Sequence, residues 1–306
     1  MSWLRFLLHF RGSSFEEIWP RILVVTLVAV IVTYIEVHYN LQGYNTLTTT
    51  PFTLIGVALS IFPGFRNNAA YDRFWEGRKL WGSLVNTSRS LARQAYSLID
   101  SKHDDKELDR FREVFVRRVI AFVHAMRCHL RDEDPAGEIQ KFLSPEDLSA
   151  VLKSSHRPLT ILQQLGHDLA YARNRRWLHE LNLPFVDAQL VELSNILGAC
   201  ERIKNMPIPF TYNVLIRRIV AFYCFFLPFG LIETAGVATP VVVFLISHAF
   251  FGLDAIGNEI ENPFDKQPNN LPLLAISRNI EINRLELINC PDRPGPIKPT
   301  KDHILL

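Results

Sequence analysis

Residues 53–82 read TLIGVALSIFPGFRNNAAYDRFWEGRKLWG, and their change of character along the segment is the strongest structural signal in this chain. The segment begins apolar and uncharged, then continues without a turn signal as a basic, aromatic, amphipathic one. This change is typical of a membrane helix that continues into water, and it is rare in a core helix of a soluble protein. Val57, Ile61 and Phe65 recur at every fourth residue, so they share one helix face. That stripe predicts either ordinary packing or, with several copies around an axis, apolar rings that constrict a channel.

Four segments are apolar enough to be candidate membrane spans: Ile22–Ile35, Pro51–Phe65, Ile219–Ile232 and Val241–Leu253. Each is shorter than the roughly 20 residues that an unassisted span needs, so each alone is also compatible with a buried core helix. The placement of Lys and Arg separates the two interpretations. Basic residues precede the first span, follow the second, precede the third and follow the fourth, whereas residues 36–50 and 233–240 contain none. This alternation follows the positive-inside rule and predicts that both termini are cytoplasmic.

The sequence between the second and third spans is helical in period and polar overall. One predicted helix places a set of apolar side chains on a single face: Phe111, Phe115, Val119, Phe122, Val123 and Met126. Ser144, followed by Pro145 and two acidic residues, predicts a helix N-cap. Further amphipathic helices are expected at Leu159–Trp177 and Val186–Lys204. No strand alternation is present and the sequence from Asn289 is Pro-rich, so we predict an all-α fold with an irregular tail.

These patterns divide the chain into four parts. Residues 1–68 would hold an N-terminal interfacial helix and the first two spans, and residues 69–212 a large helical cytosolic region. Residues 213–261 would hold the third and fourth spans, and residues 262–306 a cytosolic C-terminal segment and tail. The N-terminus has no small-residue cleavage site after its short apolar stretch, so we expect an interfacial helix there rather than a signal peptide.

Composition and motifs argue against several functional classes. The formal net charge of +2 gives no reason to expect nucleic-acid binding. The four cysteines are far apart and form no CxxC pair, which argues against zinc ribbons, redox dithiols and disulfide scaffolds. Phosphate-loop, serine-elbow and zinc-protease motifs are absent from the sequence, so we expect no enzyme, no catalytic residue and no cofactor.

One helix carries residues with metal-ligand chemistry, namely His124, Cys128 and His129. They lie within an amphipathic helix in which His124 shares the apolar face. A buried structural role accounts for them, so the sequence predicts no metal site.

Three blocks resemble the bestrophins, and the bacterial branch in particular. They are GVALSIFPGFRNNAAYDRFWEGRKLWG at 56–82, GACERIKNMPIPFTY at 198–212 and ENPFDKQPNNLPL at 261–273. The resemblance implies a homopentameric ion channel embedded in the lipid bilayer of the bacterial inner membrane. In such a channel four spans per chain surround one axial pore, and a helical extension reaches into the cytosol. It also implies a narrow apolar neck, which by position in the motif consists of Val57, Ile61 and Phe65.

The resemblance implies a second constriction, the cytosolic aperture. By position it falls on Pro184, where relatives have an aliphatic residue, and the neighbouring Phe185 is the alternative. Eukaryotic members also carry a calcium clasp, an acidic run that follows the Asn-Pro-Phe motif. Here the motif is followed by Asp265 and then Lys266. One carboxylate beside an ammonium group does not supply the several oxygen ligands of calcium, so we expect no clasp.

Ion selectivity stays open at this point. The eukaryotic branch is known for chloride and other anions, whereas bacterial relatives include monovalent-cation channels. Arg66 would favour anions in the lumen, but on a helix it lies about 100° from Phe65, so we expect it to face a neighbouring helix or a carboxylate. Asp72 and Glu76 would favour cations if they were exposed to the pore. We expect passive flow of small monovalent ions with a slight preference for anions such as chloride, and a sodium or potassium channel as the alternative.

Two other classes compete with a channel. A membrane-anchored helical adaptor or regulator has no need of the stripe, so replacing Val57, Ile61 and Phe65 by Ala would leave its binding intact. In a channel the same change would raise conductance or leak. A soluble helical enzyme, the third class, would be extracted without detergent.

Overall fold

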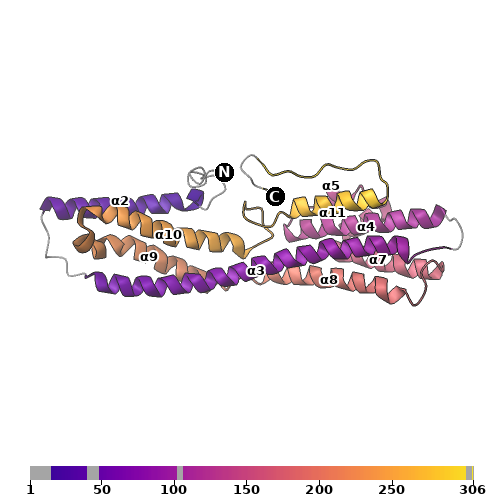
Figure 1. Ribbon diagram of the computed structural model, residues 1–306, viewed down its shortest axis with the longest axis horizontal. Coiled ribbons are helices and arrows are strands. Elements are labelled where there is room, and N and C mark those ends of the chain that lie inside the picture. The colour runs from indigo at the N-terminus through magenta and orange to yellow at the C-terminus, as the bar shows by residue number, and fades with distance from the viewer. Residues whose placement is uncertain (1–14, 40–47, 102–105, 301–304, 306) are drawn as a thin grey trace. The chain divides into compact units, whose positions relative to one another are not determined.

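The computed structural model describes residues 15–39, 48–101, 106–300 and 305, and within these ranges the chain is helical. The helices are α2 (Phe15–Tyr39), α3 (Thr49–Ser97), α4 (Lys106–Leu130), α5 (Ala136–Ile139), α6 (Pro145–Lys153), α7 (Arg157–Asn174), α8 (Leu183–Asn205), α9 (Phe210–Ala235), the 3₁₀ turn η1 (Gly236–Ala238), α10 (Thr239–Glu261) and α11 (Leu273–Leu287) (Figure 1). The described ranges contain an isolated bridge between Ile99 and Leu178 but no β-strand. The all-α prediction is therefore confirmed. The predicted interfacial helix lies largely outside the described residues.

The chain forms two compact units. Unit 1 comprises Met1–Phe74 and Pro207–Pro263, and unit 2 comprises Trp75–Met206 and Phe264–Leu306. The predicted divisions came after residues 68, 212 and 261, whereas the boundaries between the units come after residues 74, 206 and 263. Helix α3 contributes its first half to unit 1 and its second half to unit 2.

Unit 1 consists of α2, the first half of α3, α9 and α10. Its core is one apolar cluster to which every helix contributes: Ile18, Ile22, Val25 and Ala29 from α2, Leu59 from α3, Ile216, Val220, Cys224 and Leu227 from α9, and Val243, Phe251 and Ala255 from α10. The outward face of α2 is equally apolar, since Leu23, Leu27 and Ile31 are about half exposed. A helix that is apolar on all sides belongs in a membrane rather than at a protein–water surface.

Two of the described helical stretches are long and apolar enough to cross a membrane. They are α2 and the stretch Phe210–Glu261, in which η1 joins α9 to α10. Three of the four predicted spans lie inside these helices. The predicted span Pro51–Phe65 lies inside α3, which does not meet the same criterion because Thr, Ser, Gly and Pro are interspersed with its apolar residues.

Unit 2 is built around α4, which is buried almost continuously from Phe115 to Cys128. The apolar face predicted for this helix is buried apart from Phe111, which is half-buried. The predicted N-cap is also present, since the Ser144 hydroxyl accepts a hydrogen bond from the Asp147 N–H at 3.1 Å. Helix α7 ends at Asn174, earlier than predicted, because Arg176 adopts a left-handed φ of 60°. Residues 291–300 have no regular structure, as their Pro content predicted.

Candidate functional site

The first half of α3 has two different faces. Leu59, Pro63, Arg66 and Ala70 recur at spacings of three and four, and all are buried. Val57, Ile61 and Phe65 lie on the opposite face, where they are 58%, 50% and 65% exposed. Exposing this apolar face to bulk water is unfavourable, so the face marks a surface that meets lipid, another copy of the chain or a narrow pore.

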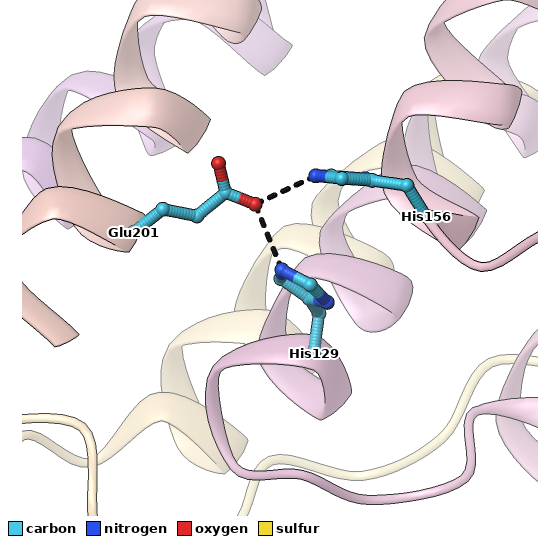
Figure 2. Close-up of side chains that lie close together, drawn as sticks. All are labelled: His129, His156 and Glu201. Carbon is cyan, nitrogen blue, oxygen red and sulfur yellow. Dashed lines mark hydrogen bonds and ion pairs between the residues drawn. The ribbon is translucent and has the colours of Figure 1, made fainter. Parts of the chain in front are cut away.

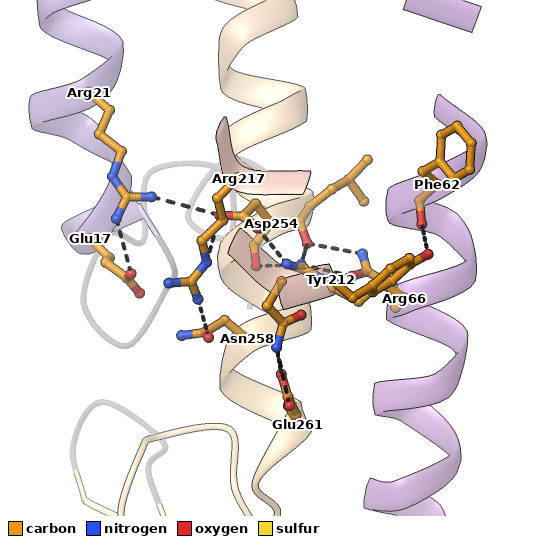
Figure 3. Close-up of polar contacts among 12 residues, drawn as sticks. Glu17, Arg21, Phe62, Arg66, Tyr212, Arg217, Asp254, Asn258 and Glu261 are labelled. Atoms are coloured by element: carbon orange, nitrogen blue, oxygen red, sulfur yellow. Dashed lines mark hydrogen bonds and ion pairs between the residues drawn. The ribbon is translucent and has the colours of Figure 1, made fainter. Parts of the chain in front are cut away.

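Arg66 does not lie on the exposed stripe. Its Nη1 donates to Asp254 Oδ1 at 2.6 Å and its Nη2 donates to the Asp254 carbonyl at 2.8 Å (Figure 3). The two side chains are only 1% and 5% exposed. Arg66 therefore points into unit 1 and contacts a carboxylate on a neighbouring helix, as its angle on the helix predicted.

Two further arginines surround the same carboxylate. Arg21 Nη1 of α2 lies 3.8 Å from Asp254 Oδ2, and Arg217 Nε of α9 lies 3.9 Å from it (Figure 3). Arg21 also contacts Glu17 at 3.6 Å. Four helices therefore bring Arg21, Arg66, Arg217 and Asp254 to one level of unit 1. These arginines are among the basic residues that the charge pattern assigned to one side of the membrane.

The opposite end of unit 1 is joined by a different contact. The Thr49 hydroxyl, at the start of α3, donates to the Gly230 carbonyl near the end of α9 at 3.0 Å. The links without Lys or Arg, 36–50 and 233–240, adjoin these helix ends. The packing within unit 1 thus separates an arginine-rich end from an end that lacks Lys and Arg.

The two acidic residues expected to influence selectivity differ in their surroundings. Asp72 is exposed. It follows Phe65 by seven residues, so it lies within about 20° of the same helix face. Glu76 belongs to unit 2, where its Oε1 accepts a hydrogen bond from Arg202 Nη2 at 2.6 Å. Of the two, Asp72 therefore lies on the same helix face as the stripe. The seven-residue spacing in the sequence already indicated this position.

The bacterial/fungal bestrophin family model matches residues 1–286. The chain belongs to the bestrophin family. It is 39% identical to a voltage-dependent anion channel-forming protein of Ralstonia nicotianae, over 95% of this chain and 94% of that protein. It is 36% identical to the voltage-dependent anion channel-forming protein YneE of Escherichia coli K12, over 99% and 97% of the two chains. Its fold is similar to a crystal structure of a bacterial bestrophin homolog from Klebsiella pneumoniae, with a TM-score of 0.82, 34% identity, and coverage of 89% of this chain and 98% of that one.

In this bestrophin the residues predicted for the aperture begin α8. Pro184 lies in the first turn and is exposed. Phe185 is 64% exposed, and its carbonyl accepts a hydrogen bond from Gln94 Nε2 at 3.4 Å. Both side chains are exposed, and Phe185 has the larger apolar one.

The acidic residues near the end of α10 are engaged with neighbours in unit 1. The Glu261 carboxylate accepts the Ile208 N–H at 2.9 Å and the Asn213 side-chain amide at 3.1 Å. Its backbone carbonyl accepts from Arg73 Nε at 2.9 Å. Asp254 pairs with Arg66, which directly follows the second predicted span. For Glu261 the basic partner bonds to the backbone, which sequence reasoning missed.

The residues that follow the Asn-Pro-Phe motif, where a calcium clasp would lie, belong to unit 2. The Lys266 ammonium contacts Glu133 Oε1 at 2.6 Å, and Asp265 Oδ1 accepts the Lys266 N–H at 2.8 Å. The side chain of Lys266 thus binds a carboxylate outside the motif.

The three potential metal ligands of α4 do not converge. His124 is fully buried, with Nε2 3.0 Å from Glu281 Oε2 and Nδ1 3.1 Å from Glu138 Oε2. The contact with His124, aided by the charge of Arg127, lowers the pKa of Glu138 to about 2 despite partial burial. Cys128 accepts from Arg127 Nη2, and burial raises the pKa of its thiol. His129 points toward α7 and α8 instead.

Proposed function

We propose that this bestrophin is a passive ion channel in which five copies surround one axial pore, with Val57, Ile61 and Phe65 as its apolar neck. The carrying observation is the exposed apolar stripe on the face of α3 opposite its buried contacts. Copies arranged around an axis would turn that stripe toward a shared narrow pore and away from bulk water. The relatives named as anion channel-forming proteins support the same function.

The neck would restrict ion flow by excluding water (dewetting) rather than through charged side chains. Rings of Val, Ile and Phe give water few partners, so an ion would lose part of its hydration shell or wait for the neck to widen. Arg66 is neutralised by Asp254 inside unit 1, so it adds no charge to the neck. Selectivity would then come from charges above or below the neck.

The placement of charges in unit 1 supports a defined membrane orientation. Arg21, Arg66 and Arg217 gather around Asp254 at one end, whereas the links at the other end contain no Lys or Arg. With the arginine-rich end facing the cytoplasm, four spans and two cytoplasmic termini satisfy the positive-inside rule. The inner membrane of a bacterium is the proposed location.

The proposed preference is for chloride, with a monovalent-cation channel as the second candidate. Chloride is supported by the names of the relatives and by the excess of arginines over carboxylates around Asp254. The cation alternative is favoured by Asp72, which is exposed on the face of the stripe. Five copies of this residue would form the kind of carboxylate ring that cation channels use.

The deciding experiment is the reversal potential of the purified protein in a planar bilayer under a KCl gradient. Reversal toward the chloride equilibrium potential supports the anion channel, and Asp72→Asn should then leave it nearly unchanged. Reversal toward the potassium potential supports the cation channel, and Asp72→Asn should then shift it. Glu76→Gln is the matched control, because Glu76 pairs with Arg202. A pentamer that carries no current would contradict the proposal.

A further inference from the structure

Three side chains from distant parts of the sequence meet in unit 2. They are His129 near the end of α4, His156 at the N-cap of α7, and Glu201 in α8 (Figure 2). Glu201 Oε1 lies 2.8 Å from His129 Nε2 and 2.7 Å from His156 Nε2. The two imidazole rings are tilted by 32°, with their centroids 4.8 Å apart.

We propose that His129, His156 and Glu201 bind a divalent transition-metal ion, and that zinc fits them best. Their three donor atoms all lie within 4.8 Å of one another. Bonds of about 2.0–2.1 Å in a tetrahedral site place neighbouring ligand atoms about 3.3 Å apart, so movements below about 1 Å would admit the ion. Two imidazoles and one carboxylate suit zinc, whereas calcium and magnesium prefer oxygen ligands throughout.

The site is accessible from a neighbouring pocket. The side chains of His129, His156 and Glu201 are 31%, 34% and 24% exposed, so an ion can enter and a water can occupy the fourth position. A polar pocket of about 240 Å³ is bordered by His129 together with Asp132, Glu133, Ser154 and Arg157.

Lys204 forms two hydrogen bonds next to the proposed site. Its ammonium donates to the His129 carbonyl at 3.0 Å and to Asp132 Oδ1 at 2.6 Å. These bonds hold the end of α4 against α8 and occupy the carboxylate of Asp132. Asp132 is therefore engaged elsewhere, and the metal ligands that face one another are His129, His156 and Glu201.

A proton-sharing cluster without metal is the competing explanation. In that arrangement Glu201 Oε1 accepts an N–H from each imidazole, which alone would link α4, α7 and α8. His156 Nδ1 accepts the Leu159 N–H at 3.4 Å, so metal binding at Nε2 costs this long capping bond. We therefore expect weaker zinc binding than in a site whose second imidazole nitrogen faces an acceptor.

The test is zinc binding by the purified, tag-free full-length protein in detergent after chelator treatment. Zinc chloride is titrated against a chromophoric chelator, and the melting temperature is followed in parallel. We expect one zinc ion per chain and a rise in melting temperature with zinc concentration. Cobalt(II) in the same site should show visible absorption of the strength typical of tetrahedral coordination.

Each ligand has a conservative variant that preserves its neighbours. Glu201→Gln and His129→Gln keep hydrogen-bonding groups, and His156→Asn keeps an N-cap acceptor. We expect each to weaken zinc binding by at least about tenfold. His167→Gln, which changes an exposed histidine of α7, should bind zinc like the wild type.

Two results would overturn the proposal. One is the absence of stoichiometric zinc binding by the wild type. The other is equal zinc affinity in the wild type and in ligand variants that keep the elution volume of the folded protein, which would make any bound zinc adventitious. None of these measurements depends on ion conduction, so a failure here is distinguishable from a failure of the proposed channel function.

Discussion

At the scale of the residue, the Arg66 guanidinium neutralises the buried carboxylate of Asp254 in unit 1. It is bound to Asp254 by two hydrogen bonds in a setting where both side chains are nearly inaccessible. Removing one partner of a buried ion pair leaves the other charge unpaired, which costs about 3–5 kcal/mol. Arg21 and Arg217, at 3.8 and 3.9 Å, would offset part of this cost.

We therefore expect Arg66→Gln to destabilise the protein by about 3 kcal/mol, seen as a lower melting temperature in detergent. Arg217→Gln is the control. Arg217 is half-exposed, and its contact with the same carboxylate is longer, at 3.9 Å, so its loss should cost less. A fall of equal size in both variants would mean that Arg66 has no special role in balancing Asp254.

Glu138 makes stability depend on acidic pH. Its pKa is lowered from 4.5 to about 2, first by the contact with His124 and then, against the opposing effect of burial, by Arg127. Burial raises the pKa of Glu281, but its bonds to His124 and Lys141 outweigh that effect and the net shift is downward. A lowered pKa means that the folded state holds the charged form more strongly than the unfolded state does.

The stabilising contribution of Glu138 is present above pH 4.5 and is lost as the pH falls toward about 2. A shift of this size corresponds to about 3 kcal/mol, and solvent screening of a side chain that is 31% exposed reduces it. Denaturant unfolding at several pH values should show this loss, and Glu138→Gln should flatten it. Glu146→Gln, at an exposed position in α6, should not change the slope.

At the scale of the helix, Gly257 permits the close contact between α10 and α3. A Cβ atom at this position would lie 2.0 Å from Asn67 Oδ1 and 2.5 Å from Arg66 Nη2. The amide of Asn67 also donates to the Leu253 carbonyl at 2.9 Å. A methyl group at residue 257 would therefore displace the Asn67 amide and the Arg66 guanidinium from the positions in which they bond to α10.

Gly257→Ala is expected to cost about 1–3 kcal/mol through overpacking, measured by the melting temperature of the purified protein. Gly252→Ala is the control within the same helix, because its nearest neighbour would be Ile18 Cδ1 at 3.8 Å, an ordinary contact. Since Ala favours helix over Gly, the control should be neutral or stabilising. The opposite ranking of the two variants would contradict this account of the contact.

For the whole molecule, the question is what covers the exposed apolar faces of unit 1. Phe65 on α3 and Phe222 on α9 are 65% and 64% exposed in the single chain. If α3 lines a pore, Phe65 meets water and ions, whereas Phe222 meets lipid or a neighbouring chain. A cysteine placed at each position distinguishes these surroundings, because a charged thiol reagent reaches a thiol in water but not one in lipid.

We expect a charged, water-soluble thiol reagent to modify Phe65→Cys and to change the current, while leaving Phe222→Cys unmodified. The background is Cys290→Ser, because the other three native cysteines are buried. The measurement is current before and after the reagent, with labelling followed by mass. Labelling of residue 222 but not of residue 65 would place the pore elsewhere.

Local features were predictable from the sequence because backbone geometry alone produces them. The stripe Val57/Ile61/Phe65 follows from the helical repeat, and the Ser144 cap from the chemistry of a hydroxyl before a helix. The alternation of basic residues around the apolar segments was likewise visible along the chain. The all-α class and the positions of most helices follow from such features, whereas the resemblance to bestrophins rests on the three sequence blocks at 56–82, 198–212 and 261–273.

Contacts between helices depended on tertiary packing. Glu201 lies 45 residues from His156 and 72 from His129, and Arg66 lies 188 residues from Asp254. Helical period tells which face a residue occupies, but not which helix covers that face or at what height. Helix α4 carries His124, Cys128 and His129 within two turns, yet packing sends the two imidazoles to different partners. Those partners are chosen by the crossing and register of helices packed on an apolar core, because a polar group buried there must find whichever partner lies within bonding distance.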